Sequence, residues 1–379
     1  MEKFLGIYIH IPFCKQKCYY CDFCSAPARE DTKQKYVLSL IENIRVSSLY
    51  FADRVVDSVF FGGGTPTCLS YEQLDNILEA IKEHYRVAKD AEISLECNPA
   101  TADLNFLQHL RQSGFNRLSI GVQSAHNEEL KALGRIHTFE DFQRTYLDSR
   151  VAGFENINID IMYGIPCQTE SSFEHTLESI VSFSPEHISA YALKIEPGTV
   201  FFKNKEKLIL PDEDSEYNMY KLAVNLLRDA GYRHYEISNY AKNGFESRHN
   251  LKYWNCDDYV GLGISAHSCI GRDRYAVISS LKKYITCDFC ENSYYTVTEK
   301  LTSDEFIEEY IMMRLRLGKG LNESDFKSKF GKDIPQKYID RINTFVKKGY
   351  MVSSENGYHF SDDGMYLSNY FLSEILDLE

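Results

Sequence analysis

Three cysteines near the start of the chain have the clearest capacity for chemistry: Cys14, Cys18 and Cys21, in the spacing Cys-x3-Cys-x2-Cys. They follow an apolar run, GIYIHI (6–11), that predicts a strand. Three thiolates this close together can bind one face of an iron–sulfur cubane. The fourth iron then keeps an open position for a ligand from outside the chain.

Other cysteines leave two alternatives open. Cys21-x2-Cys24 and Cys287-x2-Cys290 have the spacing of a zinc site built from two knuckles. Cys24 is also a candidate fourth ligand, which would close the cluster. The triad spacing at a strand end favours the open cluster with Cys24 as a bystander, and the roles of Cys24, Cys287 and Cys290 stay open.

Strand-like runs alternate with helical periodicity over most of the chain, which predicts a parallel sheet with right-handed crossovers. No dinucleotide fingerprint follows the first strand, so an α/β fold of the partial (β/α)6-barrel type is favoured over a Rossmann sheet. In such barrels the chemistry lies on loops after the strands. The expected strands are 6–11, 57–63, 92–97, 117–122, 156–164, 187–193 and 234–238, and the expected helices are 31–49, 71–85, 102–113, 126–133, 139–151, 170–182 and 212–230.

The pattern changes after about residue 300. Amphipathic helices are expected at 303–317, 322–331 and 335–349, followed by a hairpin at 351–360 around Asn356-Gly357 and by a last helix. This order predicts a small winged-helix-like domain. We therefore expect a barrel core at 1–240, a connector at 241–300 and the C-terminal domain at 301–379.

Composition limits the function classes. The chain has 379 residues, 44% of them apolar, and a net charge of −13. A disordered chain is excluded, and the negative charge gives no general attraction for nucleic acid or anionic membranes, so the C-terminal domain is expected to pack or act as a lid rather than to bind DNA. No signal peptide or membrane span is evident, which predicts a cytoplasmic protein with reduced thiols.

Six segments together resemble the radical S-adenosylmethionine (SAM) superfamily: YIHIPFCKQKCYYCDF, GGGTPT, ECNP, GVQS, LGRIH and DIMYGIPCQT. The similarity points to the branch that contains the oxygen-independent coproporphyrinogen III oxidases and the HemW-type haem chaperones. It implies a [4Fe-4S] cluster on Cys14, Cys18 and Cys21, with the amino and carboxylate groups of SAM on the free iron.

The resemblance also implies a SAM site at the strand ends. Glycine permits close backbone approach, carboxylates and amides accept from ammonium and ribose groups, and an arginine fork matches a carboxylate. Tyr8 and Tyr20 flank the cysteines and are expected to line the sulfonium and adenine. The implied SAM-binding residues are Tyr8, Tyr20, Gly63, Gly64, Thr65, Glu96, Gln123, Arg135 and Asp160.

A second motif, HNLKYW (249–254), is similar to the haem-binding H-N-x-x-Y-W motif of the chaperones. The resemblance implies haem binding by His249, Tyr253 and Trp254, with His249 as the axial ligand and the two rings against the macrocycle. Arg248 and Lys252 are expected to meet the propionates. His267 and Cys269 in the following GLGISAHSC segment are weaker candidates for iron ligands.

Two features favour the chaperones over the oxidases. Only 13 residues precede Cys14, whereas the oxidases resembled here carry a long extension, and Cys21-Asp22-Phe23 departs from the Cys-x-Cys of those enzymes. We therefore expect a haem chaperone that passes haem to an apo-haemoprotein, with no catalytic residue assigned. A respiratory acceptor and a homodimeric assembly are both compatible with the sequence. The alternatives are coproporphyrinogen III oxidase or another radical SAM enzyme, and a plain iron–sulfur electron carrier.

Overall fold

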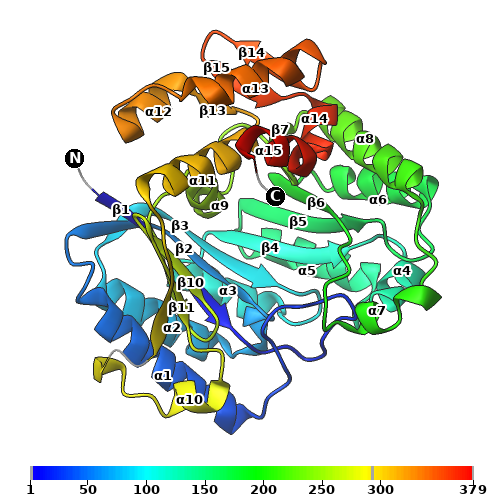
Figure 1. Cartoon of the computed structure of the whole chain (residues 1–379). Coiled ribbons are helices and arrows are strands. Elements are labelled where there is room, and N and C mark those ends of the chain that lie inside the picture. The colour runs from blue at the N-terminus through cyan, green and yellow to red at the C-terminus, as the bar shows by residue number, and fades with distance from the viewer. Residues whose placement is uncertain (1–2, 292–293, 378–379) are drawn as a thin grey trace.

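One large sheet organises the barrel. In a computed structural model, which describes residues 3–291 and 294–377, it has 12 strands in the order β12-β11-β10-β9-β1-β2-β3-β4-β5-β6-β8-β7. The strands β1 to β6 are mutually parallel, and helices cover their outer face (Figure 1). The expected partial (β/α)6 barrel is confirmed.

The parallel strands and their crossover helices follow the expected ranges closely. The strands are β1 (Lys3–Ile11), β2 (Arg54–Gly63), β3 (Val87–Cys97), β4 (Arg117–Gln123), β5 (Asn156–Tyr163) and β6 (His187–Ala192). The helices are α1 (Glu30–Ser48), α2 (Tyr71–His84), α3 (Leu104–Ser113), α4 (Asn127–Ala132), α5 (Phe139–Val151) and α6 (Glu170–Ser182). Capping boxes at Ser70, Thr138 and Thr169 begin α2, α5 and α6, so local sequence sets where these crossovers start.

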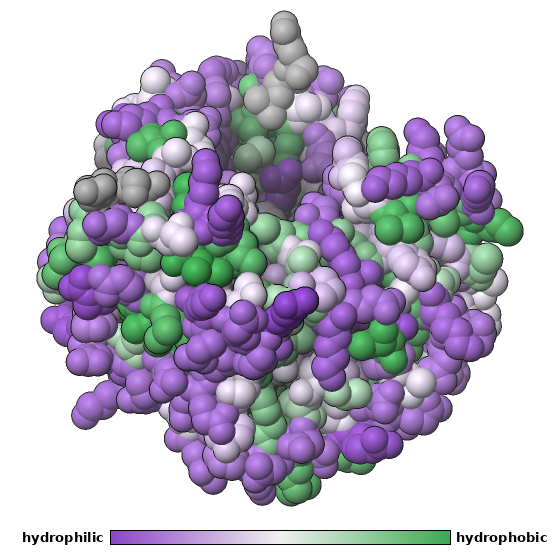
Figure 2. Space-filling view, turned by 90° about the horizontal axis from the view of Figure 1, so that it is seen from below, coloured by the Kyte–Doolittle hydropathy of each residue, from purple (hydrophilic) through white to green (hydrophobic). Residues whose placement is uncertain are grey.

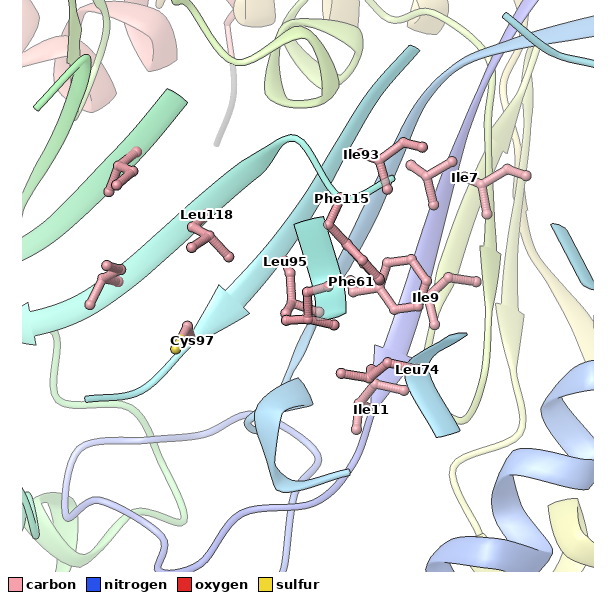
Figure 3. Packing of buried hydrophobic residues seen from close by; sticks show 14 of the residues in the cluster. Ile7, Ile9, Ile11, Phe61, Leu74, Ile93, Leu95, Cys97, Phe115 and Leu118 are labelled. Carbon is pink, nitrogen blue, oxygen red and sulfur yellow. The ribbon is translucent and has the colours of Figure 1, made fainter. Parts of the chain in front are cut away.

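The two faces of the sheet differ in polarity. Figure 3 shows Ile7, Ile9 and Ile11 of β1 packed with residues such as Phe61 and Leu74 on the helix side. Because side chains alternate along a strand, the residues between them point into the barrel. These inward residues are mostly polar: His10, Glu92, Ser94, Glu96, Arg117, Ser119, Gln123, Asn158, Asp160, His187 and Ser189. A polar lumen of this kind is suited to a ligand rather than to a sealed apolar core.

Later segments extend the sheet at both edges. At one edge, β9 (Tyr259–Leu262) pairs parallel with β1, and β10 (His267–Ile270), β11 (Asp273–Val277) and β12 (Tyr295–Lys300) continue it antiparallel. At the other edge are β8 (Asn239–Ala241) and β7 (Arg233–Glu236). The prediction of a further parallel strand at 234–238 was wrong, because β7 pairs antiparallel with β8 in a hairpin that ends the barrel.

Four further helices lie between β6 and β12. They are α7 (Val200–Lys203), α8 (Glu213–Asp229), α9 (Arg248–Trp254) and α10 (Leu281–Ile285), with 3-10 turns at Lys205–Lys207 and Phe289–Glu291. Another 3-10 turn, Pro66–Cys68, follows β2. The helix α9 carries the whole HNLKYW motif. Among the described residues, no helix is long and apolar enough to span a membrane.

The C-terminal region has its own core and its own small sheet, above the barrel in Figure 1. Its elements are α11 (Ser303–Leu315), β13 (Leu321–Asn322), α12 (Glu323–Phe330), α13 (Gln336–Lys347), β14 (Met351–Ser354), β15 (Gly357–Phe360), α14 (Asp362–Tyr366) and α15 (Ser368–Leu376). The sheet order β13-β15-β14, with α11, α12 and α13 before the β14–β15 hairpin, agrees with the expected winged-helix-like arrangement. Hydrophilic side chains dominate the face seen in Figure 2, which also opens into one deep recess.

Candidate functional site

A cavity of 480 Å³ lies at the carboxyl ends of the barrel strands, and we call it the lumen cavity. All three cysteines of the triad line it. So do Tyr20, Gly63, Gly64, Thr65, Glu96, Gln123, Arg135 and Asp160. The structure therefore brings the expected cluster ligands together with eight of the nine expected SAM residues.

The cysteine loop is attached to the barrel by its backbone. The Cys14 amide donates to the Ala26 carbonyl (3.3 Å), and the Tyr19 amide donates to the Leu133 carbonyl (3.0 Å). Among residues 3–291 and 294–377, no three Cys, His, Asp or Glu side chains converge on a position for a single metal ion. In a cubane each thiolate binds a different iron atom, so the three thiols need not converge on one metal position.

Gly63 and Gly64 are required by protein packing. A Cβ atom on Gly63 would lie 2.6 Å from the His10 ring, and the residue has a φ of 112°, which favours glycine. A Cβ atom on Gly64 would lie 2.5 Å from the Phe13 carbonyl oxygen. The glycines thus let β2 and the start of the cysteine loop approach each other, a different reason from the close approach to SAM that we expected.

Two carboxylates lie deep in the lumen cavity. Burial and the nearby Asp160 carboxylate raise the pKa of Glu96 to about 8, while its Oε2 atom accepts from the Gly63 amide (3.1 Å). Burial also raises the pKa of Asp160. Hydrogen bonds donated by Ser119 (3.0 Å) and Asn158 (2.8 Å) offset part of that rise. A cationic ligand would relieve the cost of ionising both groups, and SAM carries a sulfonium and an ammonium.

Arg135 lies beside the cysteine triad. Its guanidinium donates to the Asn98 side chain (2.7 Å) and to the Gly121 carbonyl, and it lies 3.5 Å from the Cys18 sulfur. These protein acceptors already occupy much of the arginine fork. The geometry places Arg135 next to a cluster thiolate. Its pairing with the SAM carboxylate stays a prediction.

Gln123 and Tyr8, two further expected SAM residues, line different cavities. Gln123 has a φ of 74° at a register shift between β4 and β5, and its Oε1 atom accepts from the Tyr191 hydroxyl at 3.4 Å. Such an irregularity turns a side chain at a strand end, here into the lumen cavity. Tyr8 is the one expected SAM residue that does not line this cavity; it lines a neighbouring cavity instead.

The structure does not favour His249 as an iron ligand. The side chain is fully buried, its Nδ1 atom lies 3.0 Å from the Ser58 hydroxyl and its Nε2 atom lies 2.8 Å from the Tyr253 hydroxyl. Glu92 explains this position, because its carboxylate accepts from the Arg248 and His249 amides and fixes the start of α9 against β3. Both ring nitrogens are therefore already engaged.

The remaining residues of the motif are also partly engaged. Lys252 is 6% exposed and pairs with Asp57 at 2.7 Å, and Arg248 pairs with Asp90 at 3.3 Å. The expected contacts to haem propionates would have to break these pairs. Trp254 lines neither the lumen cavity nor its neighbour, whereas Tyr253 lines the neighbouring cavity.

Three residues of the site escaped the sequence analysis. His10 contacts the cysteine loop, and Tyr191 lines the lumen cavity. Arg117 is 2% exposed in the barrel, and its Nε atom has no hydrogen-bond partner among the described residues. Its charge offsets part of the rise that burial causes in the pKa of Asp160. Side chains alternate between the two faces of a strand, so the inward position of these residues could have been predicted from the apolar residues beside them.

Comparison with known proteins matches this geometry. Residues 8–180 match the Radical SAM superfamily, and residues 301–367 match the HemN C-terminal domain. The chain is 34% identical to heme chaperone HemW of Bacillus subtilis, covering 96% of each chain. It is 32% identical to heme chaperone HemW of Escherichia coli, covering 99% of this chain and 97% of that protein.

The chain belongs to the HemW family of radical SAM proteins.

A solved structure agrees with this membership. The coproporphyrinogen III oxidase HemN of Escherichia coli, described as a radical SAM enzyme, superposes with a TM-score of 0.84 at 26% identity, covering 99% of this chain and 90% of that chain. Membership implies a [4Fe-4S] cluster and SAM. The donor set fits both groups, because three thiols, two half-buried carboxylates and a glycine-rich strand end share the lumen cavity.

Proposed function

We propose that the protein is a haem chaperone, which binds haem and transfers it to an apo-haemoprotein. The observation that carries the proposal is the identity of 32–34% to proteins named heme chaperone HemW over 96–99% of the chain. Haem and its acceptor are then the partners. The proposal includes a respiratory haemoprotein as a candidate acceptor and a homodimer as a candidate assembly.

Within this proposal, Cys14, Cys18 and Cys21 bind the cluster, and Cys24 does not. The SAM contacts are Tyr20, Gly63, Gly64, Thr65, Glu96, Gln123 and Asp160, with Arg135 beside Cys18. A reduced cluster of this class supplies an electron for SAM cleavage. The chain's own residues hold the cluster loop against β1 and β2 and present two carboxylates to a cationic ligand.

A second candidate is an enzyme that acts on a porphyrinogen. The structural similarity to HemN over 99% of this chain favours it. The two functions differ in what happens to a tetrapyrrole: a chaperone keeps haem unchanged, whereas the oxidase converts coproporphyrinogen III.

The test uses protein reconstituted with iron and sulfide. One portion is titrated with haem, and another is incubated with coproporphyrinogen III, SAM and a reductant. We expect stoichiometric haem binding, with a Soret band that differs from free haem, and no decarboxylated product. Robust product formation without haem binding would favour the enzyme and contradict the chaperone.

A further inference from the structure

A second cavity, of 460 Å³, borders the lumen cavity, and we call it the side cavity. It lies between the β9–β11 extension of the sheet, the cysteine loop and α11. Phe23 lines both cavities, and Cys24 lines the side cavity but not the lumen cavity. The segment after the cysteine triad is therefore the wall between them.

Aromatic and iron-binding side chains meet in the side cavity. Its walls include Tyr8, Tyr253 and Tyr259, together with cysteine, methionine and histidine side chains. A volume of 460 Å³ falls within the usual range of about 300 to 1,000 Å³ for small-molecule sites. The HNLKYW motif contributes Tyr253 to this cavity.

Strand register fixes which side chains of β10 point into it. Cys269 is the cross-strand partner of Tyr259 on β9 and of Arg274 on β11, and all three line the side cavity. His267 is two residues from Cys269, so it projects from the same face of β10. The alternate residues, Ser268 and Ile270, line a separate cavity of 260 Å³ on the other face.

His267 is available to a ligand. Its side chain is exposed, and within the described part of the chain no hydrogen bond involves its ring nitrogens. The other imidazole that lines the side cavity is that of His10, whose two nitrogens face the Tyr8 hydroxyl and the Cys24 carbonyl.

Arg274, Glu309 and Cys269, which also line the side cavity, compete little with His267 for iron. Arg274 and Glu309 form a two-contact ion pair, 2.7 and 2.6 Å, so their charges offset each other. Cys269 is 3% exposed, and burial raises its pKa to about 11, which keeps the thiol protonated and a poor iron ligand.

We propose that haem binds in the side cavity with the His267 imidazole as an axial ligand of the iron. The inference rests on the proposed chaperone function and adds its binding site. It places haem across the cysteine-loop wall from the cluster and SAM. It also assigns the motif residue His249 to fixing Tyr253, through their 2.8 Å contact, instead of to iron.

The experiment titrates haemin into the reconstituted full chain and records the Soret band and the electron paramagnetic resonance spectrum. We expect His267→Ala to weaken haem binding about tenfold or more, since loss even of an outer-shell partner of a metal ligand commonly costs about 10- to 100-fold in metal affinity. Added imidazole should restore the ligated spectrum. His267→Met should bind haem with a changed spectrum, because thioether replaces imidazole.

Two controls separate the outcomes. His175→Ala removes an exposed imidazole on α6 and should leave haem binding unchanged. His249→Gln should keep an imidazole-ligated spectrum. An unchanged spectrum in both His267 variants, or loss of the imidazole signature in His249→Gln, would overturn the assignment to His267. Absence of haem binding by the unsubstituted protein would instead contradict the proposed function itself.

Discussion

The Nε2 atom of His10 lies 2.9 Å from the carbonyl oxygen of Cys24, and its Nδ1 atom lies 3.1 Å from the Tyr8 hydroxyl. A neutral imidazole has one N–H, so Nε2 donates to the carbonyl and Nδ1 accepts from Tyr8. Burial lowers the pKa of His10, which favours this neutral form. One side chain of β1 thus holds the cysteine loop directly after the triad.

Replacing His10 should loosen that loop. In His10→Ala the Cys24 carbonyl loses its partner, at a cost of about 1 to 3 kcal/mol. We expect the reconstituted variant to lose cluster iron to a chelator several-fold faster than the unsubstituted protein, with an unchanged circular dichroism spectrum. The surface variant His175→Ala is the control, and equal rates of iron loss in the two variants would count against this role of His10.

The cluster should depend on three cysteines and not on the fourth. Cys14, Cys18 and Cys21 line the lumen cavity, whereas the Cys24 side chain lines the side cavity. We therefore expect Cys21→Ala to abolish the visible absorbance of the cluster and Cys24→Ala to retain it. Iron and sulfide analysis of both variants checks this. Loss of the cluster in Cys24→Ala would mean a closed site of four thiolates.

Local signals predicted most of the barrel. Alternating apolar positions and capping residues such as Ser70 and Thr169 predicted strands and helices within a few residues of those observed. The failure at 234–238 has a physical cause: a short strand has the same sequence pattern whether its partner is parallel or antiparallel, and β7 pairs with the hairpin strand β8.

Part of the candidate site could also be predicted from the sequence, and part could not. Residues at strand ends, such as Glu96 and Asp160, share a cavity because parallel strands end at one edge. The burial of His249 depends on contacts with Ser58 and Glu92, which lie more than 150 residues earlier. A local sequence pattern cannot predict such long-range contacts. The HNLKYW motif therefore suggested a histidine ligand but not the burial and hydrogen bonds of its side chain.

SAM binding should depend on pH through Glu96. Burial and Asp160 raise the pKa of Glu96 to about 8, so without a ligand the side chain is largely protonated at neutral pH. A cationic ligand favours the ionised form, so SAM affinity should rise from about pH 6 to about pH 8, by up to about tenfold per pH unit. Glu96→Gln should bind SAM weakly with little of this rise, as measured by calorimetry.

The matched control for that series is Glu196→Gln, which changes a partly exposed carboxylate at the same cavity. It should retain the pH dependence of the unsubstituted protein. If Glu96→Gln keeps the full pH dependence, the titrating group lies elsewhere.

Acid should destabilise the fold through His249. Burial, with Lys252 and Arg117 nearby, lowers the pKa of His249 to about 3. The unfolded chain, with an ordinary histidine pKa near about 6.5, binds a proton that the folded chain excludes. The stability from this group is therefore full above about pH 6.5 and is lost as pH falls towards about 3, at up to about 1.4 kcal/mol per pH unit.

His249→Gln removes that contribution. Urea unfolding at about pH 7 and about pH 5 should show a smaller loss of the free energy of unfolding in the variant than in the unsubstituted protein. The difference will be partial, because burial also lowers the pKa of His137 and His234 to about 4. Identical losses in the two proteins would show that His249 does not titrate differently in the folded state.

Haem transfer from the loaded protein to an apo-haemoprotein, such as an apo-cytochrome b, tests the central claim most directly. The measurement is the rate at which the acceptor's Soret spectrum appears after stopped-flow mixing, over a series of acceptor concentrations. A chaperone that hands haem over in a complex predicts a rate that rises with acceptor concentration and exceeds spontaneous haem release. A rate that stays equal to spontaneous release at every acceptor concentration would contradict it.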